Sequence, residues 1–306
     1  MPQAKWYKGN IHTHTTRSDG DTEPEKVVAW YRRHGYDFLV LSDHNHLTLL
    51  EYGEGRRRFR RPLMVPGEEV SANINNGTVP IHIGGIGISR VVEAIDAGEI
   101  VATIQANVDA ILQAGGIASI NHPNFRWAFD HEAIKQVTGA SLLEVYNGHP
   151  LTNVYGGPGR PSYDEIWDRV LSAGRAIFGV ATDDSHRFRD FEPGQSNPGR
   201  GWVVVRSTEL SKEAIVEGLA SGEFYSSTGV DLAELEADRE AVRLRIEEQS
   251  GKVYATRFIG KDGLLLAEVA GLEAEYRVRG DEGYVRALVV SSGNTKAWTQ
   301  PVFTEG

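Results

Sequence analysis

Short apolar runs recur along the first two thirds of the chain, and each ends in a cluster of polar residues. Most of these runs are bounded by Gly, Pro or Asn, which is typical of buried strands. We predict strands over residues 6–14, 37–44, 63–69, 79–83, 116–122, 141–147 and 176–184.

A helical period appears between several of these runs. In residues 22–35, Pro24 stands at an early position, and Val27, Val28 and Tyr31 form one apolar stripe before a closing glycine. Pro is favoured in the first turn of a helix, and Gly is favoured just past its end. Further helices are predicted over residues 101–114, 163–173 and 208–222.

Alternating strands and helices predict an α/β fold with a parallel sheet. The polar clusters all stand at the carboxyl ends of their strands, where the catalytic residues of α/β barrels lie. Seven such units favour a barrel, including a distorted one. A doubly wound open sheet is the alternative, but it would bring seven strand ends to one point less readily.

The pattern changes after about residue 203. We predict three parts: a barrel over residues 1–203, a helical connection packed on it over 204–231, and a small β module over 232–306. In the last part apolar and polar residues alternate, which is typical of antiparallel strands. This part has no histidine, so we expect it to shape the substrate pocket or support the fold rather than carry chemistry.

Composition excludes several classes of function. The 306 residues include no cysteine, so any metal must be held by nitrogen and oxygen ligands. The net charge of −10 makes binding to a nucleic-acid polymer unfavourable. We interpret the basic cluster at residues 56–61 as a solvated surface rather than an anion site. There is no apolar run long enough to span a membrane and no secretory leader pattern, so the expected location is the cytoplasm.

The segment around His12 and His14 holds the first candidate chemistry. Residues two apart on a strand point to the same face, so both imidazoles enter one space. Asp19 follows after a turn and offers a carboxylate to the same region. Two imidazoles and a carboxylate at a strand end are suited to a metal ion. The alternative is a surface strand with two solvated histidines.

Other strand ends add ligand-type residues, more than one ion can use. Two or three cations such as Mn²⁺, Zn²⁺ or Fe²⁺ would suit the mixture, and Glu69 could bridge two of them. His82 could instead be a core histidine, and Glu144 could orient a ligand. The added candidates are His44, Glu69, His82, His122, Asp184 and His186.

The order of these motifs resembles the PHP (polymerase and histidinol phosphatase) superfamily over about residues 5–190. The resemblance implies a distorted (β/α)7 barrel with a di- or trinuclear centre that hydrolyses phosphate esters. The matching motifs are His12-x-His14, Asp19-Gly20, Ser42-Asp43-His44-Asn45, Pro66-Gly67-Glu68-Glu69, Asn121-His122-Pro123 and Asp184-x-His186. The implied ligand sets are His12, His14, Glu69 and Asp184 for one metal, Glu69, His82 and His122 for a second, and Asp19, His44 and His186 for a third.

Shorter motifs near residues 201–203, 223–229 and 297–303 are similar to a narrower branch, the CehA/McbA-like metallohydrolases. Members of that branch cleave carbamate or aryl ester bonds as well as, or instead of, phosphoesters.

We therefore predict a metal-dependent hydrolase, with phosphoesterase favoured, in which a hydroxide bridging two metals attacks a small-molecule substrate. A carboxyl-ester or carbamate hydrolase using the same site is the alternative. A non-catalytic metal-binding barrel is disfavoured, because structural sites use about four ligands. The residues expected to carry catalysis are Glu69, His122, Asp184 and His186, with Arg17, Arg126 or Arg187 stabilising the leaving oxygen.

Overall fold

A computed structural model gives the structure of residues 3–50 and 62–304; the basic cluster at 56–61 lies outside the described residues. The helices lie close to four of the predicted segments, with one short addition. They are α1 (Pro24–Arg33), α2 (Ile100–Gln113), α3 (His131–Ile134), α4 (Tyr163–Ser172) and α5 (Lys212–Ser221).

The helix boundaries follow local chemistry. Pro24 occupies the first turn of α1. Ser162 and Glu165 form a reciprocal capping box at the start of α4. Helix α5 begins later than predicted because the side chain of Ser211 caps it, and it ends at Gly222 with a φ of 79°.

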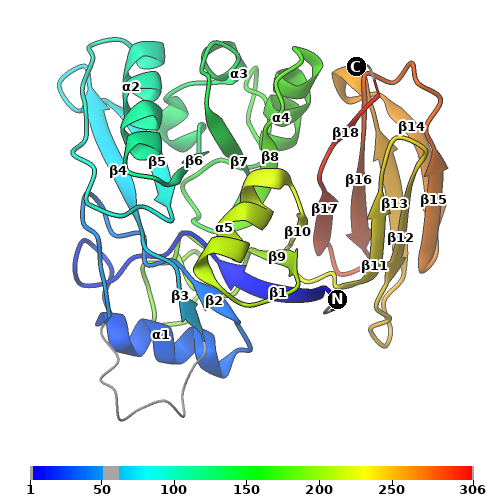
Figure 1. The fold of residues 1–306 in the computed structure, drawn as a ribbon, viewed down its shortest axis with the longest axis horizontal. Coiled ribbons are helices and arrows are strands. Elements are labelled where there is room, and N and C mark those ends of the chain that lie inside the picture. The colour runs from blue at the N-terminus through cyan, green and yellow to red at the C-terminus, as the bar shows by residue number, and fades with distance from the viewer. Residues whose placement is uncertain (1–2, 51–61, 305–306) are drawn as a thin grey trace.

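One sheet of five strands carries much of the predicted site. Strands β6, β7 and β8 are parallel, whereas β4 and β5 form an antiparallel hairpin and β5 pairs antiparallel with β6. Helices α2 and α4 pack on this sheet through a buried core that includes Ile104, Ile111 and Trp167 (Figure 1). The strands are β4 (Gly67–Ile74), β5 (Val79–Ile86), β6 (Ile117–Ile120), β7 (Ala140–Asn147) and β8 (Phe178–Thr182).

A second sheet of ten strands runs through the rest of the molecule. Only β1, β2 and β3 are parallel to one another; the other pairs are antiparallel. In spatial order the strands are β14 (Leu265–Ala270), β13 (Tyr254–Ile259), β16 (Tyr284–Ser291), β17 (Lys296–Thr299), β10 (Phe224–Ser227), β9 (Trp202–Ser207), β1 (Lys5–Asn10), β2 (Phe38–Leu39) and β3 (Leu63–Met64), with β18 (Val302–Phe303) beside β16.

These sheets correct the prediction of a distorted (β/α)7 barrel, because the strands of the described residues form no closed barrel. The predicted strand 63–69 divides at Pro66, which has no N–H for a ladder, into β3 of one sheet and β4 of the other. A turn with Asn75, Asn76 and Gly77 at positive φ then returns the chain as a hairpin, where a βα unit was expected.

The C-terminal strands are antiparallel, as predicted. A three-stranded sheet of β11 (Leu232–Ala237), β12 (Ala241–Ile246) and β15 (Glu273–Arg277) packs on the end of the ten-stranded sheet (Figure 1). Residues 202–227 form β9, α5 and β10, so two strands accompany the predicted helix. The domain boundaries at 203 and 231 stay predictions. None of the helices in the described part of the chain is long and apolar enough to cross a membrane.

Candidate metal centre

All nine side chains predicted as metal ligands lie together at one end of the strands. They belong to four overlapping groups, and the ligand atoms within each group lie within 4.8 Å of one another. Their roles as ligands stay a prediction, but the strand-end rule selected residues that the fold brings together. The nine are His12, His14, Asp19, His44, Glu69, His82, His122, Asp184 and His186.

The innermost candidate ligands are His12, His14, Glu69 and Asp184, and their atoms are spaced like the ligands of one metal ion. His12 Nε2 lies 3.2 Å from His14 Nε2, from Asp184 Oδ1 and from Glu69 Oε1. His14 Nε2 lies 3.3 Å from the same oxygen of Asp184. Ligands placed about 2.1 Å from a tetrahedral ion are about 3.4 Å apart. The four side chains therefore fit a divalent cation held by nitrogen and oxygen.

Glu69, near the start of β4, faces imidazoles from both sheets. Its Oε1 lies 3.0 Å from His122 Nε2 and 3.5 Å from His82 Nδ1, and its Oε2 lies 2.9 Å from His44 Nδ1. Within the described residues, His82 Nδ1 is buried without a hydrogen bond, whereas Glu69 Oε2 lacks a hydrogen bond but has ion-pair contacts with His44 and His14. A buried unpaired atom such as His82 Nδ1 costs about 1–3 kcal/mol, which a cation beside it would offset. His82 therefore faces the candidate centre rather than the core.

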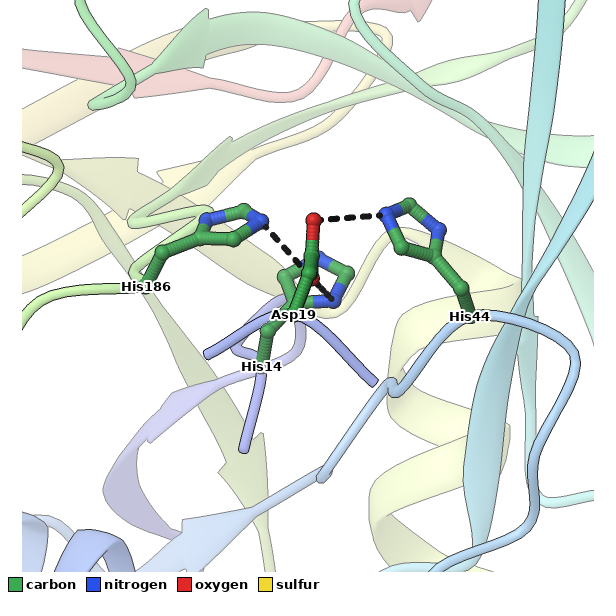
Figure 2. A group of neighbouring side chains, drawn as sticks. All are labelled: His14, Asp19, His44 and His186. Carbon is green, nitrogen blue, oxygen red and sulfur yellow. Dashed lines mark ion pairs between the residues drawn. The ribbon is translucent and has the colours of Figure 1, made fainter. Parts of the chain in front are cut away.

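Asp19 forms a further group with His14, His44 and His186 (Figure 2). Its carboxylate lies 3.3 Å from His186 Nε2, 3.6 Å from His14 Nδ1 and 3.6 Å from His44 Nε2. The three rings come from different segments and converge on one carboxylate. The side chain of Asp19 is 55% exposed, so this group lies nearer to solvent than the innermost one.

The electrostatics of the cluster favour added positive charge. Burial by itself would raise the pKa of Glu69 and of Asp184, but nearby imidazoles, above all His12, hold both pKa values well below the usual range. Conversely, burial would lower the pKa of His44, yet Glu69 and Asp19 raise that pKa to about 10. In the same way, neighbouring carboxylates raise the pKa of His12, His122 and His186 against burial. The field that retains protons on these rings would also attract cations.

Glu144 holds the ligands in place from behind. Its Oε1 accepts a hydrogen bond from His12 Nδ1 at 2.8 Å and from Thr182 Oγ1 at 2.6 Å. Its Oε2 accepts from the backbone N–H of His122 at 2.7 Å and from Asn147 Nδ2 at 2.9 Å. Because Nδ1 of His12 donates to the carboxylate, Nε2 is the ring nitrogen that faces the cluster, and it would bind a cation that displaces its proton. The buried Glu144 therefore has the orienting position that the sequence suggested.

Two buried aspartates next to ligand motifs serve the backbone instead. Asp43 accepts from the backbone N–H and the hydroxyl of Thr15. Asp183 accepts from the backbone N–H groups of residues 199–201 and from the hydroxyl of Tyr31. Only Asp184, the member of this adjacent pair that was predicted as a ligand, faces the cluster.

Seven of the nine side chains, all except the buried His12 and His14, line a cleft of about 500 Å³. Beside the candidate ligands, its walls include Phe125, Pro150, Leu151 and the exposed Arg187. Arg126 lines a smaller hollow next to it. Arg17 is exposed and does not line the cleft, so the structure does not bring it to the site as expected.

His149 also lines this cleft, although the sequence analysis did not select it. It follows β7 by two residues, and its ring centroid lies 5.4 Å from that of His186. Burial and the neighbouring His186 lower the pKa of His149. Its position just past a strand end, in Asn147-Gly148-His149, is the signal that could have identified it.

The sequence matches no protein-family model and no curated protein. Solved structures are similar in fold. A two-domain protein from Bacteroides vulgatus, containing a predicted PHP-like metal-dependent phosphoesterase, is 16% identical with a TM-score of 0.54, and the match covers 94% of this chain and 90% of that one. The fold of this chain is therefore PHP-like, which confirms the resemblance at the level of the fold.

Two further structures match part of the chain. A protein from Bifidobacterium adolescentis assigned as a metal-dependent phosphoesterase is 14% identical with a TM-score of 0.43, covering 62% of this chain and 89% of that one. An amidohydrolase from Chromobacterium violaceum is 15% identical with a TM-score of 0.38, covering 62% of this chain and 93% of that one.

Proposed function

We propose that this chain is a metal-dependent hydrolase that cleaves phosphate esters of small molecules. The observation that supports it most is the cluster of three carboxylates and six imidazoles at an open cleft, which all of them except His12 and His14 line. A structural metal site is normally closed and uses about four ligands. A larger set beside open space is typical of a catalytic centre with several ions.

The proposed ligand sets keep the assignment made from sequence, and the ions would be Mn²⁺, Zn²⁺ or Fe²⁺. His12, His14 and Asp184 would hold one ion, with Glu69 shared with a second. When bound, the ions would supply a nucleophile from water near neutral pH and neutralise charge on the phosphate oxygens. The second ion would also take His82 and His122, and a third would take Asp19, His44 and His186.

The chain supplies the remaining parts of the reaction. Glu144 fixes the ring of His12, so its Nε2 is oriented before any ligand arrives. Arg187, on the cleft wall, would pair with a phosphate oxygen of the bound substrate.

A carboxyl-ester or carbamate substrate is the second candidate. Phe125, Pro150 and the 63% exposed Leu151 make part of the cleft wall apolar, which suits a neutral substrate. The attack on a carbonyl would use the same ligands. The narrower CehA/McbA-like resemblance points the same way and stays a prediction.

The deciding experiment compares metal-loaded and chelated protein on nitrophenyl phosphate monoester, phosphate diester, acetate and carbamate. Chelator-sensitive turnover of a phosphate would support the phosphoesterase, and turnover of acetate or carbamate alone would support the second candidate. Glu69→Gln should abolish turnover, because it removes a charge from the shared ligand. The matched control is Glu213→Gln on the exposed face of α5, which should leave turnover unchanged.

A further inference from the structure

The backbone of His149 is anchored at two points beside the candidate centre. Its backbone N–H donates to Asn147 Oδ1 at 2.8 Å, and its carbonyl accepts from Thr152 Oγ1 at 2.7 Å. Asn147 in turn donates to Asp184 Oδ2 at 3.1 Å. The imidazole of His149 is therefore held relative to the ligand cluster through a short chain of hydrogen bonds.

The tautomer of His149 is also set by the chain. The backbone N–H of Leu151 donates to His149 Nδ1 at 3.2 Å. A ring nitrogen that accepts from a backbone N–H cannot carry a proton, so the neutral ring bears its proton on Nε2.

The Nε2–H group is available to a bound molecule. Within the described part of the chain it has no hydrogen-bond partner, and it is not among the fully buried polar atoms that lack one. The residue is partly exposed and lines the cleft. Its ring meets those of His186 and Phe125 edge to face, which restricts its rotation.

We propose that His149 is a catalytic hydrogen-bond donor to the leaving-group oxygen of the substrate. This inference rests on the proposed hydrolase function. As the bond between phosphorus and the ester oxygen breaks, its electron pair moves onto that oxygen, and Nε2–H stabilises the negative charge that develops there. The proton stays on His149, and the released oxygen takes its proton from water. The same role holds if the bond broken is that of a carboxyl ester.

His149 suits this role better than the arginines near the cleft. Arg187 and Arg126 are exposed, and the charge of Arg187 already acts on the nearby carboxylate of Asp21. A donor held at a fixed angle contributes more to a transition state than a mobile one, because no ordering is needed during the reaction.

The test compares leaving groups of different acidity. The substrates are aryl phosphates from 4-nitrophenyl to phenyl phosphate and the matching aryl acetates, and the variants are His149→Phe and His149→Gln. Phe keeps an aromatic ring without a donor, whereas Gln offers an amide N–H at a similar reach. His34→Phe, at an exposed histidine on the end of α1, is the matched control. Metal content is measured for every protein.

We expect His149→Phe to lower kcat by about 10²–10³-fold on phenyl phosphate and far less on 4-nitrophenyl phosphate, whose leaving oxygen needs less stabilisation. His149→Gln should recover part of the loss, with metal content unchanged throughout. An equal loss on all substrates, no loss, or a parallel loss of metal would overturn the role. Wild-type protein that turns over neither series when loaded with metal would overturn the proposed function itself, and this role with it.

Discussion

The ring orientation of His12 depends on Glu144. The carboxylate of Glu144 accepts hydrogen bonds from four donors, two at each oxygen. A carboxylate is the only side-chain group that can accept at both ends without presenting a donor. The four hydrogen bonds therefore compensate for the burial of this carboxylate, and its position indicates that it belongs to the site.

Glu144→Gln should weaken metal binding by about 10- to 100-fold. The amide of Gln has one accepting end, so its NH₂ would face donors on the other side, and the ring of His12 or the loop at His122 would shift. Competition with a chromophoric chelator measures the affinity. The control is Glu132→Gln on the exposed surface of α3, and equal affinities for the two variants would contradict the prediction.

At the scale of single residues, much of the site could be predicted. Histidines and carboxylates at strand ends are chemically distinctive, and the period-two rule placed His12 and His14 on one face. His149 was missed because it follows its strand by two residues, where the direction of a side chain depends on tertiary hydrogen bonds. Arg17 was misplaced for the same reason, since a loop residue has no strand face to direct it.

At the scale of elements, helices were easier to predict than strand pairing. Helices carry their own period and caps, and four of the five described helices lie close to their predicted ranges. Pairing direction depends on turns and partners elsewhere in the chain. The Asn-Gly turn at residues 76–77 was the local sign of the β4–β5 hairpin, and it is this hairpin that sets Ser71 opposite His82.

Helix α4 is joined to the C-terminal strands by a buried ion pair. Arg286 of β16 donates from Nε and from one terminal nitrogen to the two oxygens of Asp168, at 2.7 and 2.8 Å. The hydroxyl of Tyr284 donates to the same carboxylate at 2.8 Å. Arg286 is 1% exposed, and its guanidinium lies over the ring of Trp167.

Asp168→Ala should lower the free energy of unfolding by about 3 kcal/mol, because it leaves the buried charge of Arg286 with only the more distant carboxylate of Asp164, 3.6 Å away. Denaturant unfolding of the metal-free protein measures the change. Glu268→Ala breaks the exposed pair with Arg257 and should cost less than about 1 kcal/mol. Similar losses for the two variants would show that the buried pair has no special role.

At the scale of the whole molecule, the C-terminal strands are part of the fold that carries the site. Strand β17 pairs with β10 inside the ten-stranded sheet. The side-chain amide of Gln300 accepts a hydrogen bond from the N–H of Gly179 and donates one to its carbonyl. Both groups lie on the edge of β8 that faces away from β7. The sequence could not predict this, because it depends on contacts between residues more than a hundred positions apart.

A chain ending at residue 231 should therefore fail to fold. It would leave β10 and β8 with unpaired edges and expose the apolar surface now covered by Trp298, which is 1% exposed. Size-exclusion chromatography and circular dichroism would then show aggregates without a cooperative thermal transition. A monomeric truncated protein with a sharp transition would contradict this and would make the C-terminal strands a separate module. Gln300→Ala is the milder test, and it should cost about 1–3 kcal/mol by leaving the buried N–H of Gly179 unpaired, while its carbonyl keeps the hydrogen bond from Ser226.

The candidate metal centre also lies where the two large sheets meet. His12, His14 and His44 follow strands of the ten-stranded sheet, whereas Glu69, His82, His122 and Asp184 belong to the five-stranded sheet or follow it. At this junction the backbone is linked by the isolated bridges Thr13–Ser185 and His44–Glu69. Bound cations would therefore cross-link the sheets, adding to backbone hydrogen bonds such as those from the His14 N–H to Ser185 and from the Asp184 N–H to His12.

Removal of metal should accordingly destabilise the whole molecule. At a metal concentration 100 times Kd, one bound ion adds about 2.7 kcal/mol, which for a chain of 306 residues corresponds to a Tm about 4 °C above that of chelated protein. Hydrogen exchange should locate the effect, with faster exchange after chelation at residues 11–15, 42–45 and 183–187, and little change in β12 and β15 of the three-stranded sheet.

Calorimetry with Mn²⁺, Zn²⁺ and Mg²⁺ in turn controls for non-specific binding, because Mg²⁺ prefers oxygen ligands and should shift Tm least. Uniformly faster exchange, or an unchanged Tm, would contradict the idea that cations cross-link the sheets.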